Sequence, residues 1–190
     1  MIDLSKASVI GEGNERICYQ HPNNKSKVIK ITKSDVKSRK QNEIDSIYYK
    51  YLQIKGIDFS HLAICYGYEK TNLGNGLVFE NISNEDNSKI FTFEDVLKNK
   101  SLDYNVLKTM LDNLANYLMD NKILFVDVGL SNLICKKDTN GEYKLIIIDG
   151  LGSRHLGLKF WLYRNFLFLA KIKIDKQIKK LYASFEKMVK

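Results

Sequence analysis

The stretch that decides the fold reads 124-LFVDVGLSNLIC-135, 136-KKDTNGEYK-144 and 145-LIIIDGLG-152. Two apolar runs flank a polar turn with an Asn-Gly dipeptide, a pattern typical of a β-hairpin. Asp127 precedes this hairpin, Asn132 stands where its first strand begins, and Asp149 follows its second strand. Because a hairpin brings its outer ends together, we expect Asn132 and Asp149 to be neighbours in space.

These three polar residues suggest a chemistry. Oxygen ligands of the kind that Asn132 and Asp149 offer can bind a hard cation such as Mg²⁺. Asp127, on the loop beside them, could then orient or deprotonate a hydroxyl nucleophile. Phosphoryl transfer needs this arrangement, because a metal ion and positioning do most of the work. The alternative is that both aspartates only form turns, a common role for this residue type.

Composition limits the class of protein. The chain has 190 residues, with 44% apolar and 27% charged side chains, as in ordinary soluble globular proteins with one sizeable core. The first residues, MIDLSKAS, contain no apolar signal core, so we expect a cytoplasmic protein. The three cysteines are odd in number and lie in apolar runs, which argues against a disulfide framework. No CxxC or Cys/His spacing points to a zinc site.

The charge of the chain is unevenly distributed. Residues 1–153 hold 20 basic and 20 acidic side chains, whereas residues 154–190 hold 10 basic and 2 acidic ones. The tail therefore carries the whole net charge of +8. Such a local excess suggests an anionic partner for the tail.

The N-terminal part reads as a small sheet with one helix. A glycine-rich hairpin is expected over residues 7–19, where Gly11 and Gly13 would let backbone amides approach a phosphate. Lys30 lies inside the apolar strand 27-KVIKI-31 and needs an anionic partner if it is buried. An amphipathic helix within residues 34–55 could supply Glu43 as that partner; otherwise Glu43 is a solvated helix carboxylate.

In the middle of the chain, the sequence pattern changes from one typical of strands to one typical of helices. Strands are expected at residues 62–68 and 77–79, joined by a turn at 72–76, with 80–90 as a connector. A short helix over residues 92–98 would be capped by Thr92, with Asp95 three positions later. Apolar residues at helical spacing predict a long helix over 103–121, which leads to the Asp127 loop.

The order of these parts resembles a protein-kinase-like fold. More narrowly, the chain resembles the YrbL family of PhoP regulatory network proteins, in the runs IGEGNERICY, QNEIDSIYYKYL, TNLGNGLVFE, LFVDVGLSNL and LIIIDGLGSR. The resemblance implies an α+β, protein-kinase-like two-lobe fold in a single domain over residues 1–190. The N-lobe, about 1–82, would be a small antiparallel sheet with one helix. The C-lobe, about 90–190, would be reduced, mainly helical and end in a basic amphipathic tail.

The kinase-like resemblance also implies roles for individual residues, with ATP and Mg²⁺ as cofactors. Asp127 would be the catalytic aspartate, and Asn132 and Asp149 would hold the metal ion. The nucleotide would be bound by the following residues: Gly11 and Gly13 over its phosphates, Lys30 paired with Glu43, and backbone groups of Glu80 to Ile82 at the adenine.

Departures from the kinase pattern narrow the function. Phe125 and Val126 replace the usual histidine and arginine before the catalytic aspartate, Gly150 replaces the usual phenylalanine, and no Ala-Pro-Glu segment comes after it. We therefore expect an ATP-dependent kinase of a small molecule, a glycan or an envelope lipid hydroxyl rather than of proteins. The alternative is a catalytically inactive, nucleotide-binding regulatory pseudokinase of the PhoP network.

The tail, residues 159–190, combines aromatic and basic side chains. One helical face of the tail is apolar and includes Ile178, Leu181, Tyr182, Phe185 and Val189. Three lysines lie beside this face: Lys176, Lys179 and Lys180. Such a helix could lie on an anionic membrane surface at the inner face of the membrane, or its apolar face could pack onto the helical lobe. Nucleic acid is not an expected partner, because no base-reading module is visible.

Overall fold

In the computed structural model of the chain, which describes residues 1–34, 40–86 and 88–190, two compact units form. Unit 1 comprises Met1–Ile57 and Ala63–Ile82, and unit 2 comprises Asp58–Leu62 and Ser83–Lys190. The mixed α+β composition with an antiparallel sheet, which the sequence predicts, is confirmed. All three cysteines are free thiols.

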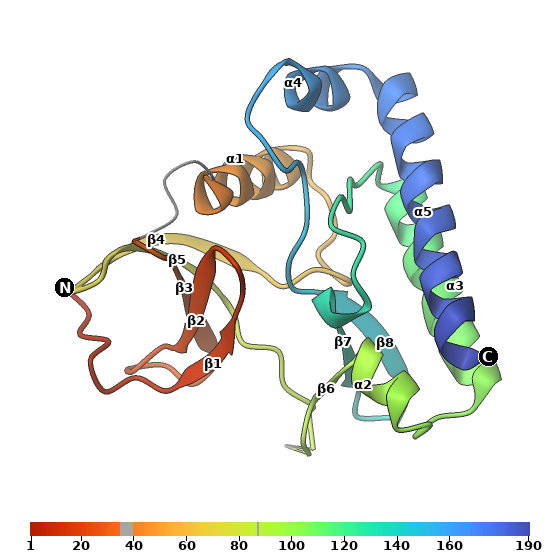
Figure 1. The fold of residues 1–190 in the computed structure, drawn as a ribbon, viewed down its shortest axis with the longest axis horizontal. Helices are drawn as coiled ribbons and strands as arrows, with labels where there is room; N and C mark the ends of the chain where they lie inside the picture. Colours follow the sequence, from red (N-terminus) through yellow and green to blue (C-terminus); the bar gives the residue numbers. More distant parts are fainter. Residues whose placement is uncertain (35–39, 87) are drawn as a thin grey trace. The chain divides into compact units, whose positions relative to one another are not determined.

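Unit 1 is a five-stranded sheet with one helix (Figure 1). The strands follow the spatial order β1-β2-β3-β5-β4, and all neighbours are antiparallel. The elements are β1 (Val9–Glu12), β2 (Arg16–Gln20), β3 (Lys27–Thr32), α1 (Gln41–Ile54), β4 (Cys65–Thr71) and β5 (Gly74–Glu80). The glycine-rich hairpin is confirmed, although Gly11 belongs to β1 itself and pairs with Cys18.

Several boundaries in unit 1 differ from expectation. The strand expected at residues 62–68 is observed as β4, Cys65–Thr71, because Leu62 instead bridges Ile147, and the strand expected at 77–79 is observed as the longer β5, Gly74–Glu80. The predicted turn at residues 72–76 is shorter, because Gly74 already begins β5 and Gly76 is paired with Glu69. A Cβ on Gly76 would lie 2.3 Å from Ile29 Cγ2, so the close packing of β3 on β5 needs glycine there. The expected helix of residues 34–55 is observed as α1, and its 35–39 part lies outside the described residues.

Unit 2 combines a three-stranded antiparallel sheet of order β6-β7-β8 with the helices α2 to α5. Its elements are β6 (Phe91–Thr92), α2 (Phe93–Lys98), α3 (Tyr104–Asp120), the 3₁₀ turn η1 (Leu130–Asn132), β7 (Leu133–Lys137), β8 (Tyr143–Ile147), α4 (Leu158–Asn165) and α5 (Leu167–Val189). The predicted capping box is present, because Thr92 and Asp95 exchange hydrogen bonds at the start of α2. The predicted hairpin is β7–β8.

The end of the chain contributes to the core of unit 2. Helix α5 lies alongside α3 (Figure 1), and its Leu181 and Phe185 are fully buried. The Phe185 ring stacks on Phe93 with centroids 5.9 Å apart. Of the two interpretations of the apolar stripe in residues 178–189, packing within the protein is therefore the one observed.

A short segment between α1 and β4 also belongs to unit 2. Leu62 forms a bridge with Ile147 of β8, and the Tyr117 hydroxyl of α3 donates to the Asp58 carbonyl. The His61 ring lies 4.8 Å from the Tyr117 ring, and its Nδ1 is 2.8 Å from the Leu145 carbonyl. The segment Asp58–Leu62 is thus fixed on the β7–β8 hairpin by backbone and side-chain bonds.

Candidate functional site

The loop between α3 and β7 folds around Asp127. The carbonyl oxygen of Asp127 accepts bonds from the Gly129 amide at 2.7 Å and from Asn132 Nδ2 at 2.9 Å. Asn132 Nδ2 also lies 3.4 Å from the Asp127 carboxylate. The loop therefore holds Asn132 against Asp127, five residues earlier in the chain, before β7 begins.

The segment after β8 returns to the same loop. The Ile148 amide donates to the Asn132 carbonyl at 3.0 Å, and the Gly150 carbonyl accepts from the amides of Val126 at 2.8 Å and Asp127 at 3.0 Å. Asp149 lies between these anchors, with its Oδ1 accepting from the Gly150 amide at 2.7 Å. The structure therefore brings Asp149 beside Asn132 and Asp127, as the hairpin predicts.

Arg154 is a residue of this site that sequence reasoning missed. Its Nη2 lies 3.2 Å from Asp127 Oδ1, and the two side chains are 63% and 62% exposed. An ion pair this exposed contributes little to stability, so both groups can exchange partners at small cost. A basic residue five positions after Asp149 was the only sequence signal for it.

The site offers oxygen ligands of the type that Mg²⁺ prefers. Because Asn132 bonds Asp127 through its amide nitrogen, its Oδ1 is the atom that would coordinate a cation, together with the Asp149 carboxylate. Mg²⁺ commonly takes one or two protein oxygens and completes its shell with water and phosphate oxygens, so these residues fit the ion. No cluster of three His, Cys, Asp or Glu side chains suited to a metal occurs among the described residues.

In unit 1, Lys30 occupies a buried position on β3. Only 7% of the residue is exposed, and its Nζ lies 4.6 Å from the centre of the Phe79 ring. Asn42 at the start of α1 donates from Nδ2 to the Lys30 carbonyl at 2.8 Å. The helix is thus bonded to the strand at the position of the lysine.

The buried acid of α1 is Asp45. Asp45 is 2% exposed and accepts from Arg16 Nη1 at 2.6 Å, and the same nitrogen donates to Asn42 Oδ1 at 3.0 Å. Glu43, in contrast, has a 46% exposed side chain and pairs with Lys40 at 3.2 Å, one turn away. The pairing of Glu43 with Lys30 stays a prediction, whereas the Arg16–Asp45 pair ties α1 to β2.

The two glycines of the hairpin have open surroundings. A Cβ built on Gly11 would meet no described atom within 4 Å, and one on Gly13 would meet only the Arg16 carbonyl, at 3.8 Å. Every residue of β1 is exposed. A side chain at either position would therefore overlap no described residue, and Gly11 also lies at an irregularity in the pairing of β1 with β2.

Two backbone amides at the end of β5 already donate hydrogen bonds within unit 1. The Glu80 amide donates to the Ile64 carbonyl and the Asn81 amide to the Ser26 carbonyl, both at 2.8 Å. Ile82, the last residue of unit 1, is 8% exposed. The donor that an adenine ring could use in this segment is therefore the Ile82 amide, with the Glu80 carbonyl as the acceptor.

A family model described as PhoP regulatory network protein YrbL matches residues 2–186. The chain belongs to the YrbL family. Two curated relatives, from Escherichia coli (strain K12) and Shigella flexneri, are each 27% identical over 163 residues, covering 82% of this chain and 76% of the relative. Both are named uncharacterized protein YrbL, so the relatives name a family without naming an activity.

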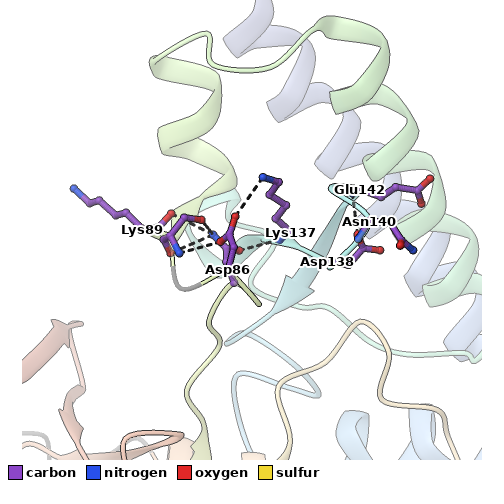
Figure 2. A network of polar contacts seen from close by, with 8 residues as sticks. Asp86, Lys89, Lys137, Asp138, Asn140 and Glu142 are labelled. Atoms are coloured by element: carbon purple, nitrogen blue, oxygen red, sulfur yellow. Dashed lines mark hydrogen bonds and ion pairs between the residues drawn. The ribbon is translucent and has the colours of Figure 1, made fainter.

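A second polar group of this YrbL-family chain has a structural explanation. Figure 2 shows Asp86 and Lys137 at the edge of the β7–β8 hairpin, 3.3 Å apart. The amide of Lys137 donates to Asn84, which is buried and in turn donates to Ser88 and Lys89. Hydrogen bonds from Ser88 lower the pKa of the Asp86 carboxyl to about 2. This network fastens the entry of unit 2 to β7. A shallow depression beside it is lined by Glu85, Asp86, Lys137, Asp138, Thr139, Asn140 and Gly141, and Asp86 and Lys137 already pair with each other there.

Proposed function

We propose that this YrbL-family chain is an ATP-dependent phosphotransferase that acts on a hydroxyl group of a small molecule, a glycan or an envelope lipid. The observation that carries the proposal is the meeting of Asp127, Asn132 and Asp149 around the Gly150 backbone. Catalysis of phosphoryl transfer depends mainly on positioning and on neutralising charge, and these three residues supply the groups for both tasks.

The roles in unit 2 are assigned from the side chains. Asn132 and Asp149 would hold Mg²⁺, which supplies charge neutralisation at the transferred phosphoryl group when bound. Asp127 would orient the acceptor hydroxyl and take its proton. Its exposed carboxylate can leave Arg154 for a substrate, because an exposed pair of this kind exchanges easily.

The roles in unit 1 concern the nucleotide. Lys30 would bind phosphate oxygens, Gly11 and Gly13 would cover them with backbone amides, and the Glu80 carbonyl and Ile82 amide would bind adenine. Glu43 would support Lys30, as the resemblance to kinases implies. The kinase-like two-lobe arrangement is itself part of this proposal, and the division of the chain into two compact units supports it.

The acceptor class is inferred from the segment after Asp149. Two helices, α4 and α5, occupy this part of the chain, and α5 packs on α3. Protein kinases bind their peptide substrates through a longer segment that includes an Ala-Pro-Glu motif, which this sequence lacks. A small or lipid-linked acceptor is therefore the better match.

A regulatory pseudokinase is the second candidate, and one contact favours it. Arg154 pairs with the proposed catalytic carboxylate, and Phe125 and Val126 stand where active protein kinases carry a histidine and an arginine. In that case nucleotide binding would switch the conformation of the protein without turnover.

An ATP turnover assay with Mg²⁺ separates the two candidates. Purified protein is incubated with and without an extract of envelope glycolipids, and ADP release is compared with that of the Asp127→Asn variant. Turnover that depends on the extract and on Asp127 supports the enzyme. Binding of ATP with no turnover under either condition supports the pseudokinase, and failure to bind ATP contradicts both.

A further inference from the structure

The junction of α4 and α5 exposes an unusual amount of apolar surface. Exposed side chains of this kind within residues 156–172 are Leu156, Leu158, Trp161, Phe166, Phe168, Leu169 and Ile172. Leu158 and Phe168 are 72% and 73% exposed. The rings of Trp161 and Phe166 are in contact, with centroids 5.9 Å apart. Clustered exposed apolar side chains on a folded protein usually mark a surface that binds a protein or a membrane. We call this set the elbow surface.

The elbow surface is separate from the face by which α5 joins the core. That face is a single stripe at helical spacing, formed by Ala170, Ile174, Gln177, Leu181 and Phe185, all of them buried. Phe168, Leu169 and Ile172 lie on the other side of the first turns of α5 and are not needed for the packing on α3. Their exposure is therefore a property of the folded unit rather than of a loosely attached tail.

Positive charge surrounds these apolar side chains. Lys159 and Lys171 are exposed within the elbow, and Lys176, Lys179 and Lys180 continue along the exposed side of α5. Residues 154–190 hold 10 basic and 2 acidic side chains, while the rest of the chain is neutral. An apolar surface within a basic helical pair has the composition of segments that lie in the headgroup region of a bilayer.

We infer that the elbow surface is a docking site for an anionic lipid membrane. Its aromatic and aliphatic side chains would enter the headgroup region, with the lysines of α4 and α5 against lipid phosphates. No helix among residues 1–34, 40–86 and 88–190 combines the length and apolar content needed to cross a bilayer, so the helices would lie on the surface. A second copy of the chain is the poorer occupant, because two such surfaces face to face would bring like charges together.

The sequence offers a direct reporter for this contact. Trp161 is the only tryptophan of the chain, stands on α4 and is 53% exposed. Transfer of its indole from water to the headgroup region would shift its emission to shorter wavelength and protect it from acrylamide. The protein is mixed at low salt with vesicles of phosphatidylcholine alone or of phosphatidylcholine with phosphatidylglycerol. We expect the shift, and co-sedimentation, only with the anionic vesicles, and we expect raised salt to reverse both.

Two variants place the contact on the elbow. Leu158→Ser combined with Phe168→Ser removes apolar area and keeps Trp161, and should lower the partition coefficient at least about tenfold. Its matched control is Ile54→Ser with Leu73→Ser, which removes exposed apolar side chains of unit 1 and should change nothing. Changing Lys159, Lys171 and Lys176 to Gln should weaken binding at least about tenfold, whereas changing the exposed Lys6, Lys25 and Lys50 should weaken it much less.

Three results would overturn the inference. The first is the absence of any shift or co-sedimentation with anionic vesicles at low salt, in protein whose circular dichroism shows it folded. The second is wild-type binding by the Leu158→Ser, Phe168→Ser variant. The third is an emission shift that grows with protein concentration in the absence of lipid, because this would make the elbow surface a contact between copies of the chain. None of these measurements depends on ATP turnover, so the inference stands or falls separately from the proposed function.

Discussion

Gly150 lies directly against the backbone of Asp127. A Cβ built on Gly150 would come within 2.8 Å of the Asp127 carbonyl oxygen and 2.9 Å of its Cβ. Gly150 also has a φ of +85°, a conformation that side chains with a Cβ rarely adopt. The segment that carries the proposed metal ligand and the loop that carries the proposed catalytic residue are therefore held together at the one residue type that fits.

Substitution of Gly150 tests this relationship. Gly150→Ala adds left-handed strain and a steric overlap, so we expect a loss of about 2–4 kcal/mol in the free energy of unfolding. Gly141→Ala is the matched control, because Gly141 has a φ of +84° but its added Cβ would meet only Lys137 Cε, at 3.8 Å. The control should lose about 1 kcal/mol, for strain alone. Urea unfolding of both variants measures the difference, and equal losses would contradict the close-packing argument.

The proposed nucleotide site predicts a thermal shift that depends on Lys30 and on Asp149. ATP with Mg²⁺ at about a hundredfold excess over its Kd should stabilise the protein by about 2.7 kcal/mol, because a ligand that binds only the folded state shifts unfolding by mass action. Lys30→Ala and Asp149→Ala should each abolish the shift, which differential scanning fluorimetry records. A shift retained in both variants would show that ATP binds elsewhere, and Mg²⁺ without ATP serves as the control for effects of the metal ion alone.

The hairpin glycines allow binding to be separated from folding. Gly11→Ala should leave the melting temperature unchanged, because no described atom lies within 4 Å of the added Cβ. ATP affinity should fall by about tenfold, equivalent to roughly 1.4 kcal/mol, if a phosphate approaches this backbone. Gly76→Ala is the opposite control, because its Cβ would overlap Ile29 and lower stability. Unchanged ATP affinity in Gly11→Ala would remove the hairpin from the site.

Local sequence signals predicted the parts of this fold that depend on neighbouring residues. The turn dipeptide and its flanking apolar runs identified β7–β8, and Thr92 with Asp95 identified the start of α2. The positions of Asn132 and Asp149 could be inferred in turn, because hairpin geometry determines which residues meet at its open end.

Contacts between distant segments could not be read in the same way. The partner of Asp45 is Arg16 on β2, which is separated from α1 in the sequence by β3. Helical periodicity alone did not show that Asp45, rather than Glu43, is the acid that faces the sheet. Arg154 reaches Asp127 only through the turn after Asp149. In the tail, the amphipathic pattern was correct, but only the packing of α5 on α3 shows that its apolar stripe is core and that the exposed apolar surface lies nearer α4.

His61 predicts a pH dependence of stability. Burial lowers the pKa of its imidazole below the usual 6.5, and this outweighs the opposite effect of the bond to the Leu145 carbonyl. The unfolded chain therefore binds a proton near pH 6.5 that the folded state does not bind. The contribution of His61 to the free energy of unfolding is therefore fully present above about pH 6.5. As the pH falls below this value, the free energy of unfolding decreases by up to about 1.4 kcal/mol per pH unit, until the pH reaches the lowered pKa of His61 in the folded state.

The variant His61→Asn tests this pH dependence, because it keeps a donor for Leu145 but does not titrate. The free energy of unfolding is measured in urea between neutral pH and pH 5 for both proteins. The wild type should lose more stability over this range than the variant, and parallel curves would show that His61 is not the responsible group. His155→Asn, at an exposed position after Arg154, serves as the control substitution.

The proposed catalytic role of Asp127 leads to the sharpest test of function. Asp127→Asn keeps the size of the side chain and removes the carboxylate that would take the acceptor proton, so turnover should fall by ~100-fold or more, the scale of losing a general base. Binding of ATP, measured by the thermal shift, should persist. Asp120→Asn, an exposed aspartate at the end of α3, is the matched control and should retain full turnover. Arg154→Gln adds a second readout, because it releases the Asp127 carboxylate from its ion pair without altering it. An Asp127→Asn variant with wild-type turnover would show that Asp127 is not the base. A cellular phenotype that survives Asp127→Asn but is lost in Lys30→Ala would identify the protein as a nucleotide-dependent switch.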